Sequence, residues 1–266
     1  MVTQEEIHSY IGSIPPSPVI LKKVLSCLRE GELNKASQEA TEDPALKLYL
    51  QNIVNKPIYG FKNSIKDIAQ IFGVLGLAQA EQIVYNYMIS LLAPKKWELF
   101  SLNEKSFSDI QDSLGIHWKK ILEHKGINDK TIYSSISLLP ASIIVCEALF
   151  KSKQEEVKLL KSVKEIDYNT ILQRLSGMSL FDLCDKIAHA WEMPEVISRI
   201  VLASSGKVQK TDKEIIELSK WMHLLFFYQL SQVNCIEAGL NDFIEFNIDY
   251  VQDIYDDFQD LIMEDT

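Results

Sequence analysis

The chain has 266 residues, of which 47% are hydrophobic, and it carries a formal net charge of −10. A chain of this length and apolar content can bury a substantial core, which excludes disorder over most of its length. The acidic balance argues against a broad phosphate-binding surface, so we expect no nucleic-acid partner.

The sequence predicts a cytoplasmic protein. Residues 1–10 carry acids and no long apolar run, so no secretory signal is expected. No segment reaches the roughly 18 uninterrupted apolar residues of a membrane span, so we expect no membrane insertion. The four cysteines are far apart and form no C-x-x-C pair, which favours reduced, mostly buried thiols: Cys27, Cys146, Cys184 and Cys235.

The N-terminal part, residues 1–94, is expected to be a lobe of short helices. A stiff entry at 14–18 leads into a helix, with Ser17 as its cap and Gly31 as its stop. The apolar stripe of that helix comprises Leu21, Val24, Leu25 and Leu28. Further helices are expected over 34–42, from 43 to about 55, from 64 to 72, and over 77–92. In this part Ser64 and Asp67 resemble a helix start, and Gly73 and Gly76 mark a break.

The stretch Asp43–Gly60 has the clearest helix signals in the chain. Asp43 suits the N-cap and Pro44 the first helical position. An apolar face follows at helical spacing: Leu46, Leu50, Ile53 and Val54. Pro57 ends the helix, and Gly60 can adopt backbone angles closed to other residues. We therefore expect a capped helix that ends in a fixed turn.

The C-terminal part, residues 95–266, is expected to be a second helical lobe, with 95–107 as the boundary. The expected helices are 108–124, 131–150, 155–161, 168–176, 180–191, one from Pro194, 211–232 and 247–263. Thr211 and Glu214 have the spacing of a capping box. In the last helix one apolar side is expected: Ile248, Val251, Tyr255, Phe258 and Ile262. The fold class is all-α, with two closely packed helical lobes.

Catalytic and metal-binding patterns are weak in this sequence. Gly73-x-x-Gly76 follows no strand and is expected to be a plain turn. His117 and His124 are seven residues apart, about 10 Å along a helix, too far for adjacent ligands of one metal. No G-x-S-x-G elbow supports a Ser-His-Asp triad, although composition alone cannot exclude one. An acidic row in the last helix is interpreted as a solvated face: Asp249, Asp253, Asp256 and Asp260.

The chain resembles the HDOD family, the HD-related output domain of bacterial signalling proteins. The resemblance is strongest in the segments DPAL at 43–46 and NKPIYG at 55–60, and it continues through 64–70 and 73–77. It is looser at 137–143 and at the tryptophan–proline junction, 190–194. It covers roughly 14–203 and implies an HD-related helical bundle acting in signal transduction, here as a stand-alone module.

HD-type phosphohydrolases, to which this family is related, need a His-Asp pair and further ligands to hold a metal that activates water. Pro140 and Ala141 match the positions of that pair, and neither side chain has a ligand atom. No His-Asp step occurs anywhere in the chain. The resemblance therefore implies a protein with no catalytic residues, no metal site and no cofactor.

Two functions remain from the sequence. The first is a non-catalytic regulatory protein with a regulatory protein partner, or with a small nucleotide as an alternative ligand. Its candidate partner-binding residues are Asn52, Asn55, Lys56 and Tyr59, although the asparagines could instead cap the helix and Tyr59 could pack between lobes. The second is a diverged metal-dependent phosphohydrolase acting on a nucleotide or cyclic dinucleotide.

Overall fold

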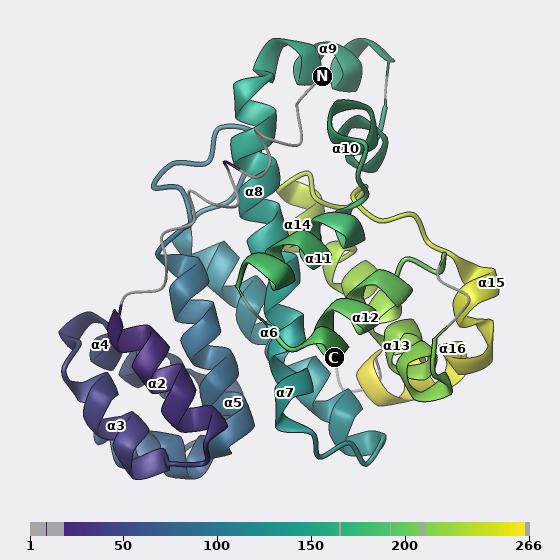
Figure 1. Cartoon of the computed structure of the whole chain (residues 1–266). Helices are drawn as coiled ribbons and strands as arrows, with labels where there is room; N and C mark the ends of the chain where they lie inside the picture. The colour runs from purple at the N-terminus through teal and green to yellow at the C-terminus, as the bar shows by residue number, and fades with distance from the viewer. Residues whose placement is uncertain (1–8, 10–18, 165, 192, 208–210, 264–266) are drawn as a thin grey trace. The chain divides into compact units, whose positions relative to one another are not determined.

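The computed structural model describes residue 9 and residues 19–164, 166–191, 193–207 and 211–263 (Figure 1). Within these residues the regular structure is helical and no strand occurs, which confirms the all-α fold class. The expected entry at 14–18, with the Ser17 cap, lies outside the described residues. The described chain divides into two compact units, 19–92 with 129–137, and 93–128 with 138–263.

The first unit is built around the long helix α5. Its helices are α2 (Val19–Arg29), α3 (Leu33–Thr41), α4 (Pro44–Val54), the 3-10 turn η1 (Pro57–Tyr59), α5 (Ile68–Ser90), α7 (Lys130–Tyr133) and the 3-10 turn η2 (Ser134–Ser137). α5 packs against α2, α3, α4, α7 and η2. The predicted apolar stripe of α2 is buried in full, and its C-terminal turn ends at Gly31 with φ +82°.

The second unit holds the remaining helices. They are α6 (Glu104–His124), α8 (Leu138–Ser152), α9 (Gln154–Lys164), α10 (Tyr168–Ser176), α11 (Leu180–Ala190), α12 (Glu195–Ala203), α13 (Lys213–Leu230), α14 (Val233–Glu237), α15 (Ile248–Val251), η3 (Gln252–Ile254), α16 (Tyr255–Phe258) and η4 (Gln259–Met263). α11 packs against α8 and α12, and α13 packs against α12, α6 and α15. This arrangement places the C-terminal segments beside the end of α12 (Figure 1).

Helix starts differ from the prediction where a competing cap is present. α5 is capped by Asp67, whose carboxylate accepts from the Gln70 N–H at 2.8 Å, and Ser64 lies outside the helix. α6 begins four residues earlier than expected, because Asn103 and Ser106 form a reciprocal capping box. Asp212, rather than Thr211, is the N-cap of α13, and no side chain caps that end.

Helix interiors also depart from the prediction at two places. The chain stays helical through Gly73 and bends only at Gly76, where φ is +73° and ψ is 169°. The last predicted helix is a series of short helical pieces, and its expected apolar side is incomplete because Ile248 is 46% exposed. A single apolar stripe cannot persist when the helical pitch changes from piece to piece.

Two helical stretches, Ile68–Ser90 and Thr131–Ser152, are long and apolar enough to cross a membrane. Their most apolar windows are 61% and 94% buried within the protein. A core helix passes the same test of length and composition, and burial of this extent is typical of one.

Candidate functional site

The predicted partner-binding residues lie on the turn between α4 and η1. Asp43 caps α4 as expected, accepting from the N–H groups of Ala45 and Leu46 at 2.9 and 3.1 Å. At the other end Asn55 is the C-cap, and Gly60 adopts the left-handed conformation with φ +70°. The predicted helix start at Asp43 and the predicted turn that ends at Gly60 are therefore confirmed.

Asn55 holds the chain segments of this turn together. Its Nδ2 donates to the carbonyl groups of Gln51 at 2.7 Å and Ile65 at 2.9 Å. Its Oδ1 accepts from the Ile65 N–H at 2.8 Å. These bonds give Asn55 the structural role that was the alternative to partner binding. Asn52 is exposed, and Lys56 and Tyr59 are half-buried.

The positions matched to a His-Asp pair lie inside α8. Ala141 is 2% exposed, Pro140 is also buried, and the neighbouring Ser142 hydroxyl donates to the Leu139 carbonyl at 2.7 Å. No side chain at these two positions can bind a metal. Across the described residues, no group of three or more His, Cys, Asp or Glu side chains is placed to hold one. The residues present therefore do not fit the metal centre of an HD phosphohydrolase.

A serine, a histidine and an aspartate do meet between α11 and α12. The Ser198 hydroxyl donates to the Asp185 carboxylate. His189 Nε2 lies 3.4 Å from Ser198 Oγ and 3.3 Å from Asp185 Oδ1. A nucleophilic triad needs the carboxylate on the other ring nitrogen, so that Nε2 is free to take the serine proton. Here the carboxylate binds the serine directly, and Ser198 is 6% exposed, so the cluster joins two helices instead of activating a nucleophile.

His117 and His124 lie on α6, as predicted, and face the aromatic side chains of other helices. The His117 ring packs edge-on against Tyr228, with 5.7 Å between centroids, and the His124 ring lies 5.7 Å from that of Trp221. Burial lowers the pKa of His117, and the nearby Lys120 adds to that effect. Both rings therefore serve packing contacts.

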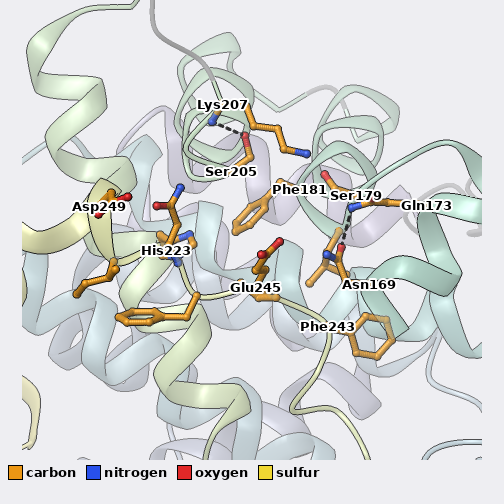
Figure 2. A pocket seen from close by; sticks show the side chains of 15 residues that line it. Asn169, Gln173, Ser179, Phe181, Ser205, Lys207, His223, Phe243, Glu245 and Asp249 are labelled. Atoms are coloured by element: carbon orange, nitrogen blue, oxygen red, sulfur yellow. Dashed lines mark hydrogen bonds between the residues drawn. The ribbon is translucent and has the colours of Figure 1, made fainter. Parts of the chain in front are cut away.

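A pocket of about 370 Å³ lies within the second unit (Figure 2). Its walls come from α10, the start of α11, the turn after α12, α13 and the segment before α15. The lining residues are Asn169, Gln173, Ser179, Leu180, Phe181, Ser205, Lys207, His223, Phe243, Ile244, Glu245, Phe246, Asn247, Ile248 and Asp249. The volume is in the range of small-molecule sites.

His223 fixes one wall of this pocket. Its ring is 1% exposed and connects three segments of chain. Nδ1 lies 2.9 Å from the Ser204 carbonyl and therefore donates to it, while Nε2 accepts the Asn247 N–H at 3.3 Å. Burial lowers the pKa of His223, against the opposing effect of the Ser204 carbonyl. The ring is therefore neutral near pH 7 and acts as a structural connector.

Tyr250 and Gly206 strengthen the same junction. The Tyr250 hydroxyl donates to the Ala203 carbonyl at 2.9 Å and lies 2.5 Å from the Ser219 hydroxyl. Gly206 has φ +72°, and a Cβ there would lie 2.9 Å from Nδ2 of Asn247. Only glycine allows this backbone approach without displacement.

Sequence reasoning missed this pocket. Its residues come from five stretches between 169 and 249, and none of those stretches has a distinctive spacing. The one usable signal was His223, a lone histidine within an apolar helix that needs hydrogen-bond partners for both ring nitrogens. Those partners are backbone groups, which the sequence does not identify.

Comparison with known proteins gives one family match, to the HDOD domain over residues 14–206. Comparison with curated proteins gives no match. A crystal structure of an HDOD domain protein with unknown function from Geobacter sulfurreducens is 18% identical, with a TM-score of 0.64, covering 97% of this chain and 88% of that one. A virulence factor from Campylobacter jejuni is 15% identical, with a TM-score of 0.45, covering 98% of this chain and 100% of that one. At these identities the first likeness shows the fold alone.

Proposed function

The chain belongs to the HDOD family, and we propose that it is a non-catalytic regulatory protein that acts in signal transduction by binding a partner protein or a small ligand. The observation that carries the proposal is the chemistry at Pro140 and Ala141. These positions match the metal-binding pair of the related phosphohydrolases, yet they are buried, apolar and part of the packed helix α8. Metal-assisted hydrolysis needs several donor atoms at one point, and these side chains supply none.

The alternative, a diverged phosphohydrolase, would require a different set of metal ligands. No group of three suitable side chains converges within the described part of the chain. The Ser198 cluster offers no substitute, because the Ser198 hydroxyl donates its hydrogen bond to Asp185 and not to the His189 ring. We therefore keep binding, rather than turnover, as the proposed activity.

A protein partner is proposed to contact the α4–η1 turn. Asn52 presents an exposed amide there, beside Lys56 and Tyr59 on the same short segment. Asn55 supports this surface by holding its backbone, through the bonds to Gln51 and Ile65. The net charge of −10 disfavours a nucleic-acid partner.

A cytoplasmic location completes the proposal. All four cysteines are buried free thiols, which suits a reducing compartment. The two helical stretches with membrane-like composition are mostly buried within the protein.

Crosslinking in the native cell, followed by capture of the full chain, tests the partner surface. The variant combines Asn52→Ala with Lys56→Ala, and the control is Lys22→Ala, an exposed residue of α2 in the same unit. We expect a partner that the wild type and the control capture and that the double variant loses. Equal capture by all three proteins would remove the turn from the proposal. Turnover of a phosphodiester by metal-loaded protein would contradict the function itself.

A further inference from the structure

The pocket in the second unit combines the family core with the segment that follows it. Asn169, Gln173 and Phe181 lie within the range matched to the HDOD domain, which ends at residue 206. Glu245 and Asp249 lie beyond that range. The charge of the pocket is therefore set by a part of the chain that the family match does not include.

The charged side chains at the pocket give it a net negative charge. Glu245 and Asp249 contribute two carboxylates, Lys207 contributes one ammonium group and His223 is neutral, which leaves one net negative charge. Among the described residues, Glu245 and Asp249 make no ion pair or side-chain hydrogen bond. Figure 2 shows Glu245 in the middle of the view, between Phe181 and Asn169. An anionic ligand would have to approach these two carboxylates against their field.

The remaining walls combine apolar, amide and hydroxyl side chains. The Phe181 ring stacks on the rings of His223 and Phe226, with 6.0 Å between centroids in each pair, and Phe243 and Phe246 are further aromatic side chains of the lining. Gln173 Nε2 donates to Asn169 Oδ1 at 3.3 Å, which orients both amides at one side. Aromatic side chains offer apolar contact area, and carboxylates bind organic cations through charge-assisted hydrogen bonds.

We propose that this pocket binds a small organic cation, an amine on an apolar body. The ammonium group pairs with Glu245 in the field of Asp249, and the apolar body lies against Phe181 and Phe246. This inference rests on the proposed function, because it names the class of ligand that a binding protein of this kind would take. It also separates that ligand from the small nucleotide, whose phosphates the pocket charge disfavours.

Titration of the full chain, followed by amide NMR shifts, tests the inference. The probes are 2-phenylethylamine, its neutral analogue 2-phenylethanol, the anion phenylacetate and cyclic di-GMP. We expect the amine to shift the amides of Lys207 and Asn247 at the pocket wall, and the other three probes to leave them unchanged. Glu245→Gln should weaken amine binding about tenfold, the loss expected for one charge-assisted hydrogen bond.

The matched controls are Glu237→Gln and Asp256→Asn, exposed carboxylates outside the pocket lining. They should bind the amine as the wild type does. Amine binding that Glu245→Gln leaves unchanged would overturn the inference, as would no shift with the amine or a shift with phenylacetate or cyclic di-GMP. None of these results bears on catalysis, so the proposed function fails separately, through phosphodiester turnover.

Discussion

At the scale of single residues, Gly206 has a conformation and an environment that exclude other side chains. Its φ is +72°, and an added Cβ would lie 2.9 Å from Nδ2 of Asn247 and 3.2 Å from Cγ of Tyr250. Gly126 is a matched control, because its φ is +67° and an added Cβ would meet nothing within 4 Å. The two glycines share a left-handed backbone conformation, and an added Cβ would meet neighbouring atoms only at Gly206.

Gly206→Ala should therefore lower the free energy of unfolding more than Gly126→Ala does. Left-handed backbone alone costs a non-glycine residue about 1–2 kcal/mol, and the steric contact should add about 1 kcal/mol or more at position 206. Denaturant unfolding of both variants measures the difference. Equal losses would show that the turn after α12 can move away from Asn247.

His223 makes the stability of the fold depend on pH. Its pKa is lower in the folded protein, so the unfolded chain takes up a proton first as the pH falls. The stability that the neutral His223 ring contributes is fully present above the pKa of the unfolded chain, about 6.5. It is lost as the pH falls from there through the lower pKa of the folded protein. His117 shifts in the same direction and adds to the effect.

Denaturant unfolding between pH 7.5 and pH 5 should show this loss, with a slope of at most about 1.4 kcal/mol per pH unit for each histidine. His223→Gln should be less stable at pH 7.5 and should depend less steeply on pH. An unchanged slope in that variant would mean that His223 does not titrate differently in the two states.

At the scale of elements, Glu147 fixes the irregular segment before α6. It is 2% exposed on α8, and its carboxylate accepts from the N–H groups of Glu98, Leu99 and Phe100 at 2.5, 3.1 and 3.2 Å. A buried carboxylate needs such donors, because water cannot reach it. These three hydrogen bonds hold the backbone of the segment in place, although the segment is not helical.

Glu147→Gln should cost about 2–4 kcal/mol of unfolding free energy, because an amide keeps one acceptor oxygen and places an NH₂ group against backbone donors. Glu155→Gln, at an exposed position in the first turn of α9, is the control and should change little. Thermal or chemical unfolding compares the two. A loss no larger than that of the control would show that water or a shifted backbone replaces the carboxylate.

Most elements could be predicted from local signals. The Asp43 cap lies in sequence beside the helix it starts, and helical periodicity identified the buried faces of α2 and α4. Predictions were wrong where two caps compete, as at Ser64 and Asp67, or where the helix type changes, as after Asn247. Such choices depend on packing between distant segments, which no local pattern contains.

The pocket could not be predicted for the same reason. It depends on the Asn247 N–H reaching His223, 24 residues earlier in the chain, and on Gly206 lying against Asn247. Asn55 shows the opposite case, since its capping role follows from its place at the end of a helix. The sequence therefore identified residues that act locally and missed those that act across the fold.

At the scale of the whole molecule, each compact unit has its own buried core. The first unit centres on α5, and in the second unit α11 packs against α8 and α12, and α12 packs against α13. The positions matched to the catalytic pair belong to the second unit and are part of its core. The family fold is therefore kept while the matched catalytic positions serve packing.

Metal content and turnover, measured on the same purified full chain, distinguish a binding protein from a phosphohydrolase. The protein is incubated with Mn²⁺, Fe²⁺ or Zn²⁺, freed of unbound metal, and assayed against cyclic dinucleotides and nucleotides. We predict metal well below one ion per chain and no turnover above the level of a protein-free control that contains the same metal. Stoichiometric metal with turnover by the unmodified chain would contradict the central claim that this protein acts by binding alone.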